Sequence, residues 1–252
     1  MYKDSNKKIV ATIEARMTSS RLPGKVLLPL AGKPALERLI ERLKRSKYVD
    51  EIVIATTTNI ADDPIIELAK KIEVKYYRGS EYDVLSRVLK AAKSADADII
   101  VEITGDCPLV DWRLIDRGVT ELFDRHIDYS ANNITFSYPD GFDVRVFPVH
   151  ILEKVNQLTD DPIDRVHVSY YIYTHPEKFK IYNWVAPKEH QWPDIRLTLD
   201  EQADYQLLSN IFENLFNKNK DFSVGDVIDL LKNKPELLEI NKYVKAKNPQ
   251  EG

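Results

Sequence analysis

The residues best suited to chemistry gather in one loop within the segment Ile9 to Leu28. The segment reads IVATIEARMTSSRLPGKVLL, so an apolar run typical of a buried strand gives way to cations and hydroxyls. Pro23 and Gly24 break any regular continuation, which places these side chains in a loop at the strand's carboxyl end. Ligands of α/β sheets bind at such ends, and cations, hydroxyls and free backbone N–H groups suit a polyphosphate. We predict that a nucleoside triphosphate binds there through Arg16, Ser19, Ser20, Arg21 and Lys25.

Two alternative interpretations of this loop are a P-loop and a solvated basic loop. A P-loop is excluded because Lys25 is followed by Val26 instead of Ser or Thr, and because Ser19 stands where a Gly is required. A basic loop without a ligand is the commoner outcome for an arbitrary cluster of cations. The position directly after a strand favours phosphate binding here.

Two aspartates that follow apolar segments are candidate metal ligands. Asp106 comes after the segment 98–104 and one Gly, and Asp200 comes directly after the segment 195–199. If both segments are strands of one sheet, their carboxylates meet at the edge that carries the phosphate loop. Mg²⁺ binds one or two carboxylates together with substrate phosphates and water. We predict a magnesium site at Asp106 and Asp200; for either residue the alternative is a helix cap or a turn.

A further loop, Gly79 to Arg87 (GSEYDVLSR), enters a helix after the third predicted strand. Its backbone amides and polar side chains could bind a base edge or a ribose, and the alternative is a capped helix with a surface Arg. We predict that the nucleoside contacts this loop and the backbone before the first cation, through Ala15, Gly79, Ser80, Glu81 and Arg87.

Composition limits the classes of function that the chain can have. Its 252 residues carry a formal charge of −4, with a pI near 5.8, so it has no overall attraction to nucleic acid or anionic membranes. The polar N-terminus and the absence of an apolar run of about 18 residues lead us to expect neither a signal peptide nor a membrane span, and the single cysteine, Cys107, excludes an internal disulfide. We expect a cytoplasmic protein without nucleic-acid or membrane partners. The histidines are scattered, so a His or Cys metal site is not predicted.

Alternating strand and helix patterns place the candidate residues on an α/β sheet. The first half contains strand patterns at 9–14, 51–56, 74–77 and 98–104, and helical patterns at 36–43, after a predicted cap at Asp62 or Asp63, after a predicted cap at Asp83, and at 111–124. This alternation predicts a mostly parallel sheet covered by helices, a three-layer α/β/α fold. The less regular second half is expected to hold strand pieces around Pro139–Gly141, helices at 149–158, 166–173 and 201–217, strands at 179–185 and 195–199, and, from Lys232 onward, a surface helix and a frayed end.

Six segments together resemble the cytidylyltransferases related to the spore-coat polysaccharide biosynthesis protein. They are, in order, RMTSSRLPGKVL, GSEYDVLSRV, TGDCPLVD, DGFDVRVF, DRVHVSYYIY and RLTLDEQADYQLL. The resemblance runs from about Ile9 to Phe216, and more distantly it includes the 3-deoxy-manno-octulosonate and acylneuraminate cytidylyltransferases. It implies a nucleotidyltransferase fold of the glycosyltransferase-A type, with CTP as a partner and Mg²⁺ as the cofactor.

The resemblance also implies roles for particular residues. Arg16, Lys25 and Asp106 would be catalytic, and the acceptor would face Asp143, Arg145, His167 and Tyr170. His167 and Tyr170 match an H-x-x-Y pattern of the octulosonate enzymes, although a lone His on a helical face is more often structural. Val166 stands where many relatives carry Glu, so one carboxylate is missing beside this predicted pocket.

We therefore predict a Mg²⁺-dependent nucleotidyltransferase that moves a cytidylyl group from CTP to a sugar-like or phosphorylated acceptor, for activated-sugar or surface polysaccharide synthesis. The alternatives are a guanylyl- or uridylyltransferase acting on a sugar phosphate, a glycosyltransferase of the same fold, and a noncatalytic nucleotide sensor. The sequence Asp96-Ala97-Asp98 precedes its strand, at the wrong edge for the D-x-D metal motif of glycosyltransferases. We expect one domain over 1–252, with a nucleotide-binding half (about 8–110), an acceptor-binding half (about 111–217) and a C-terminal helical tail (218–252). A homodimer is left open, because the chain shows no diagnostic heptad.

Overall fold

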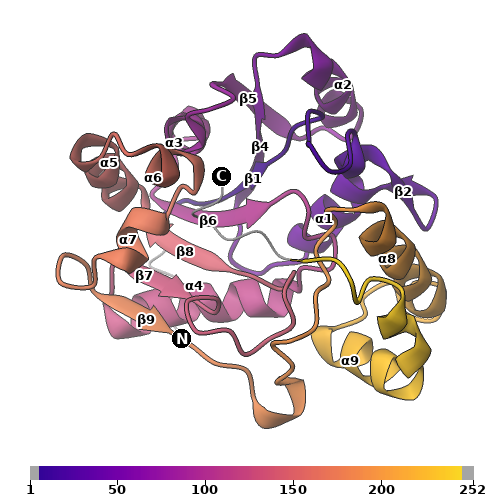
Figure 1. The fold of residues 1–252 in the computed structure, drawn as a ribbon. Coiled ribbons are helices and arrows are strands. Elements are labelled where there is room, and N and C mark those ends of the chain that lie inside the picture. The colour runs from indigo at the N-terminus through magenta and orange to yellow at the C-terminus, as the bar shows by residue number, and fades with distance from the viewer. Residues whose placement is uncertain (1–5, 246–252) are drawn as a thin grey trace.

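The computed structural model describes residues 6–245, which form a seven-stranded sheet between two layers of helices (Figure 1). The strands are β1 (Ile9–Glu14), β4 (Glu51–Thr57), β5 (Lys75–Gly79), β6 (Ile99–Thr104), β7 (Tyr129–Ala131), β8 (Arg145–Pro148) and β9 (Ile181–Asn183). Their order is β5-β4-β1-β6-β8-β7-β9, and only β8 runs antiparallel to its neighbours. The short strands β2 (Pro29–Leu30) and β3 (Lys33–Pro34) make a separate hairpin. The predicted fold class, a mostly parallel three-layer sheet, is confirmed.

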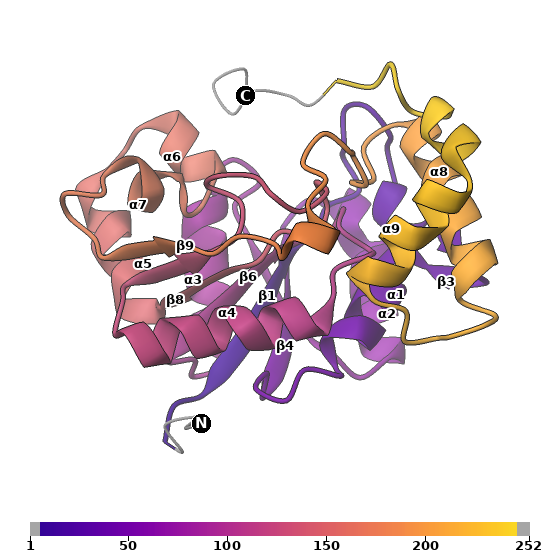
Figure 2. The ribbon, with the colours of Figure 1, turned by 90° about the horizontal axis from the view of Figure 1, so that it is seen from below.

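Both faces of the central strands are buried, as expected for a parallel sheet. Successive side chains of β1 point to opposite faces, so Ile9, Ala11 and Ile13 join one buried cluster and Val10 joins the other. The first cluster includes residues of α1 (Ala35–Leu43), α2 (Asp63–Lys71), α4 (Trp112–Arg125), α8 (Gln202–Leu215) and α9 (Val224–Asn233). The second includes residues of α3 (Val84–Ser94), α5 (Val149–Leu158) and α7 (Tyr170–Thr174). In Figure 2, α8 and α9 lie beside α1, at one side of the sheet.

The single helix predicted over residues 166–173 is wrong. The segment is divided between α6 (Pro162–Val166) and α7, and His167 is the C-cap of α6. Val168 has a φ of 36°, a left-handed conformation through which a right-handed helix does not continue. The break therefore separates His167 from Tyr170, although the predicted helix contains both.

The strand predicted at residues 195–199 is also wrong, since this segment makes only an isolated bridge between Arg196 and Asp140. Its backbone hydrogen bonds go to loops: Leu197 N donates to Asp140 O, and Leu199 N donates to Asp106 O, each at 2.8 Å. Asp200 therefore reaches the sheet edge through a loop contact and not through a strand.

The surface helix expected from Lys232 onward is wrong, because the helix here is α9, which ends at Asn233 and was not predicted from the sequence. Ser223 caps it, with Asp226 completing a capping box, and Val227, Ile228 and Leu231 are buried. A 3-10 turn, Pro235–Glu239, follows this helix. The last part of the expected frayed end, residues 246–252, is outside the described residues.

A bilayer-spanning helix, which would need about 18 apolar residues, is not found anywhere in residues 6–245.

Candidate active site

Lys25 joins two aspartates that are far apart in the sequence. Its Nζ lies 2.9 Å from Asp106 Oδ2 and 2.7 Å from Asp200 Oδ1, and its side chain is only 11% exposed. Gly24, with a φ of 74°, turns the chain into the short 3-10 helix Lys25–Leu27 that carries this lysine. The structure therefore brings the predicted phosphate loop and both predicted metal ligands into one charged cluster, which we call the Lys25 cluster.

The charges of the Lys25 cluster stabilise one another. Burial alone would raise the pKa of Asp106, but the Lys25 ammonium and hydrogen bonds from Thr104 and Lys25 hold that pKa at about 2. Burial would likewise lower the pKa of Lys25, and the charges of Asp106 and Asp200 outweigh it, so the pKa is raised. At neutral pH the cluster consequently contains an ammonium in contact with ionised carboxylate oxygen.

Close approach of two strand ends sets the position of Asp106. Gly105 N donates a hydrogen bond to Glu14 O at 2.8 Å, directly after β6 and at the end of β1. A Cβ at position 105 would lie 2.7 Å from Glu14 O and 3.2 Å from the Cβ of Ala15, so only glycine fits here. Asp106 is thereby placed at the carboxyl edge of the sheet, beside the loop that begins at Ala15.

Arg21 adds a second cation to the cluster, with Nη2 3.0 Å from Asp200 Oδ2 and Nη1 3.7 Å from Glu201 Oε1. Arg196, which our sequence reasoning missed, pairs with Asp200 and, at 3.0 Å, with Asp140. The available signal was its position four residues before Asp200. The N-cap of α8 is Glu201, so the alternative role of Asp200 as that cap is wrong.

The two predicted nucleotide loops contact each other. Glu81 Oε1 accepts a hydrogen bond from Thr18 Oγ1 at 2.6 Å and lies 3.2 Å from Arg16 Nη1. Arg87 Nη1 donates to the carbonyls of Ser80 and Glu81, at 2.5 and 3.4 Å. The structure thus brings the predicted nucleoside residues to the same edge as the phosphate loop.

Gly79 and Ala15 are packed tightly in these loops. A Cβ at Gly79 would lie 2.9 Å from Arg87 Cγ, and Ala15 is buried with its N–H directed at Ala55 O, at 3.4 Å. Ser19 is half-buried and Ser20 is exposed, and neither hydroxyl bonds to another described residue. These two hydroxyls are therefore accessible to a ligand.

Asp62, predicted as a possible helix cap, has another role. It is fully buried and does not cap α2 through its side chain. Its carboxylate accepts hydrogen bonds from Met17 N at 2.7 Å and Thr57 N at 3.1 Å, and from the hydroxyls of Thr56 and Thr57. Asp62 thus anchors the phosphate loop to the end of β4.

The predicted acceptor residues form two groups. Arg145 pairs with Asp143 at 3.5 Å and with Glu102, which sequence reasoning missed, at 3.2 Å. His167 and Tyr170 have ring centroids 6.2 Å apart. Tyr173 links the groups, since its ring lies 5.3 Å from that of Tyr170. Burial and the nearby charge of Glu102 raise the pKa of Tyr173 to about 12, against the opposing charge of Arg145.

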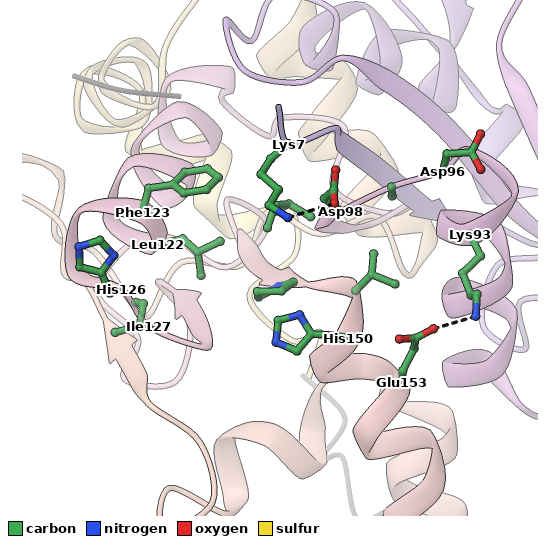
Figure 3. A pocket seen from close by; sticks show the side chains of 14 residues that line it. Lys7, Lys93, Asp96, Asp98, Leu122, Phe123, His126, Ile127, His150 and Glu153 are labelled. Atoms are coloured by element: carbon green, nitrogen blue, oxygen red, sulfur yellow. Dashed lines mark hydrogen bonds and ion pairs between the residues drawn. The ribbon is translucent and has the colours of Figure 1, made fainter. Parts of the chain in front are cut away.

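A cavity of about 570 Å³ lies at the opposite edge of the sheet (Figure 3). It is lined by the start of β6 at Asp98 and Ile99, by Phe123 and His126 around the end of α4, and by His150 of α5. No residue predicted for the site lines it. Because α/β sheets bind ligands at the carboxyl ends of their strands, we place the active site at the Lys25 cluster and not in this cavity.

A sequence model of cytidylyltransferases matches residues 10–238. The chain belongs to the cytidylyltransferase family. It is 32% identical to the spore coat polysaccharide biosynthesis protein SpsF of Bacillus subtilis over 234 residues, which cover 90% of this chain and 95% of that protein. The resemblance predicted from the six segments is confirmed.

Solved structures agree with this assignment. A cytidylyltransferase from Leptospira borgpetersenii serovar Hardjo-bovis superposes with a TM-score of 0.87 at 35% identity, covering 96% of this chain and 100% of that one. The CMP:2-keto-3-deoxy-manno-octonic acid synthetase complexed with CTP shares the fold, with a TM-score of 0.61 at 17% identity over 82% of this chain and 100% of its own. As a cytidylyltransferase, the protein is a nucleotidyl-transferring enzyme.

The residues of this cytidylyltransferase suit a hard metal ion. Among residues 6–245 there is no group of three or more His, Cys, Asp or Glu side chains that could hold a metal. Asp106 and Asp200 nonetheless offer two carboxylates that contact a single cationic nitrogen. This donor set fits Mg²⁺, which completes its shell with phosphate and water, better than it fits a metal that needs His or Cys.

Proposed function

We propose that this cytidylyltransferase transfers the cytidylyl group of CTP to a sugar-like or phosphorylated acceptor, with Mg²⁺, and releases pyrophosphate. The observation that carries the proposal is the Lys25 cluster, where Lys25 contacts both Asp106 and Asp200 at the carboxyl edge of the sheet. The similarity to SpsF supports an acceptor from polysaccharide synthesis.

The triphosphate would lie along the loop that carries the cations of the site. Arg16 is 45% exposed and its only ion pair among the described residues is with Glu81, so it can turn toward a phosphate at small cost. Lys25 and Arg21 are held beside the carboxylates that would bind the metal. Together they would neutralise the pyrophosphate as it leaves.

The reaction requires an in-line attack of an acceptor oxygen on the α-phosphorus of CTP. A P–O bond to the acceptor forms, the P–O bond to pyrophosphate breaks, and the acceptor hydroxyl, or the acceptor phosphate, loses any proton that it carries. Bound Mg²⁺ would withdraw charge from the phosphate oxygens, and Asp106 and Asp200 would hold it. Asp106, whose pKa is about 2, is ionised throughout the neutral range and needs no activation for this role.

The proposal is tested by incubating the enzyme with each of four nucleoside triphosphates and with a panel of acidic sugars and sugar phosphates. Pyrophosphate release should require Mg²⁺ and should be faster with CTP than with UTP, since a site that pairs with an amino group leaves polar atoms unmatched when a carbonyl replaces it. Faster turnover of GTP than of CTP would contradict the choice of base. Release without any acceptor would contradict transfer.

A further inference from the structure

The face of the sheet beneath α3 and α7 becomes polar close to the Lys25 cluster. Thr12, Glu102 and Arg145 are neighbours in register across β1, β6 and β8. Glu14 lies two residues beyond Thr12 and therefore points to the same face. We call these four residues the inner polar row. Its position is next to the proposed metal ligands, because Glu14 O accepts the hydrogen bond of Gly105, the residue before Asp106.

Several buried atoms around the inner polar row have no hydrogen-bond partner among the described residues. They are four oxygens and one nitrogen: Thr12 Oγ1, Glu14 Oε1, Glu102 Oε2, Asn133 Oδ1 and Arg87 Nε. Thr12, Arg87 and Glu102 are at most 3% exposed. A buried polar group without a partner costs about 1–3 kcal/mol, so native proteins keep few of them. So many unpaired acceptors in one place indicate a site for hydrogen-bond donors.

The two cations beside this row already have partners, so the row is unsuited to an added anion. Glu102 and Asp143 share the guanidinium of Arg145, at 3.2 and 3.5 Å, and Arg87 already donates to two backbone carbonyls. Burial, and then the charge of Glu102, raise the pKa of Glu14 to about 8, and burial raises the pKa of Glu102 as well. A phosphate placed against this row would face carboxyl groups without a free cation.

We propose that Glu14 and Glu102 bind hydroxyl or amino groups of the acceptor, on the part of the acceptor remote from its attacking oxygen. The inference rests on the proposed function, since it takes the acceptor to lie beside the Lys25 cluster. The acceptor is then a sugar that presents free hydroxyl or amino groups to this row and carries no phosphate there. Glu14 and Glu102 are specificity residues in this account, and the transfer step does not pass through them.

The test uses Glu14→Gln and Glu102→Gln, with Glu153→Gln as the matched control. Glu153 lies at the opposite edge of the sheet, where it pairs with Lys93 at 2.7 Å. The assay is pyrophosphate release with whichever acceptor of the panel the wild-type enzyme turns over. The amide nitrogen of Gln cannot accept a hydrogen bond, so a donor group of the acceptor is left unpaired, which should raise the acceptor KM roughly 10- to 100-fold in the two test variants. The KM for CTP should change by less than about twofold, and the control should match the wild type.

Acceptor analogues that lack one hydroxyl or amino group identify the group that each carboxylate binds. The wild-type KM for the analogue that lacks the group bound by Glu14 should be as high as the KM of Glu14→Gln for the complete acceptor. Testing that analogue with Glu14→Gln should raise the KM little further. Hydroxyl and amino partners are distinguished by which analogue shows this behaviour.

The outcomes separate the inference from the proposed function. If both variants keep the wild-type acceptor KM and lose only thermal stability, Glu14 and Glu102 are structural and the inference is overturned. If Glu102→Gln fails to fold because Arg145 loses a partner, Glu14→Gln still decides, since Glu14 Oε1 has no partner to lose. Absence of pyrophosphate release from the wild type with every acceptor would overturn the proposed function, and the inference with it.

Discussion

Replacing Lys25 by Met tests the Lys25 cluster most stringently, because Met keeps a similar side-chain length and removes only the ammonium. Lys25 Nζ contacts Asp106 at 2.9 Å and Asp200 at 2.7 Å, and its side chain is 11% exposed. Breaking a fully buried pair costs about 3–5 kcal/mol. Asp200 keeps Arg21 and Arg196 as partners and Asp106 is 26% exposed, so we expect a loss of only about 1–3 kcal/mol.

The same substitution should affect catalysis more than folding. The ammonium is proposed to balance charge that develops on the departing pyrophosphate, and the loss of one such group lowers kcat by roughly 10²-fold or more. Steady-state kinetics with CTP and the acceptor measure this. Lys93→Met is the matched control, because Lys93 is exposed and, within residues 6–245, forms its one ion pair with Glu153.

Magnesium should partly restore the stability of Lys25→Met. Without the ammonium, Asp106 and Asp200 lack the cation between them, so Mg²⁺ should bind the free variant more tightly than the free wild type. For a Kd of ~1 mM, 10 mM Mg²⁺ contributes ~1.4 kcal/mol, which corresponds to a rise in Tm of roughly 3–6 °C for a chain of this size. The wild type should gain less, and thermal unfolding with and without Mg²⁺ measures the difference.

Either of two results would refute this account of Lys25. Turnover of Lys25→Met within about threefold of wild type would show that the ammonium does not stabilise the transition state. Equal stabilisation of variant and wild type by Mg²⁺ would show that Lys25 does not occupy the place of a cation between the two aspartates.

Three more predictions concern other parts of the site. His167→Ala should raise the KM for the acceptor and leave that for CTP nearly unchanged; equal effects on both, or on neither, would make His167 a structural residue. The free energy of unfolding of Glu14→Gln, relative to that of the wild type, should be higher at pH 9 than at pH 5. The pKa of this carboxyl rises from 4.5 to about 8 in the folded state, so its contribution is present below pH 4.5 and is lost as the pH rises through 8. At about 1.4 kcal/mol per pKa unit, this difference in stability between variant and wild type can grow with pH by at most ~5 kcal/mol. Urea denaturation measures it, and a difference that does not grow with pH would contradict the prediction. Gly105→Ala should lose activity and stability together, because its Cβ would lie 2.7 Å from Glu14 O; a variant of unchanged activity and Tm would show that the strand ends can move apart.

Local sequence patterns were sufficient to predict most of the sheet and the loops at its carboxyl edge. The buried strands β1, β4 and β6 are mostly apolar runs, and Asp83 caps α3 as predicted, accepting from Ser86 N at 3.0 Å. Such features depend on neighbours in the chain, so periodicity and capping residues reveal them.

Features that depend on distant contacts were not predictable in the same way. Asp200 is placed by the hydrogen bond from Leu199 N to Asp106 O, and an extended segment held by loops has the same pattern as a strand. The positive φ of Val168 has no local signal, because β-branched residues rarely adopt it. Glu102 was visible as one charge within the apolar run IIVEIT, but only the register with Arg145 shows its partner.

The most direct test of the central claim is Mg²⁺-dependent release of pyrophosphate from CTP in the presence of an acceptor, compared between the wild type and Asp106→Asn. Asn keeps the size of the side chain and removes the charge that contacts Lys25 at 2.9 Å. We expect the wild type to turn over only with Mg²⁺, to stop on chelation and to recover when Mg²⁺ is added back, whereas folded Asp106→Asn should lose most of its activity. Full turnover by Asp106→Asn with unchanged dependence on Mg²⁺ would contradict the claim that the Lys25 cluster is the catalytic centre.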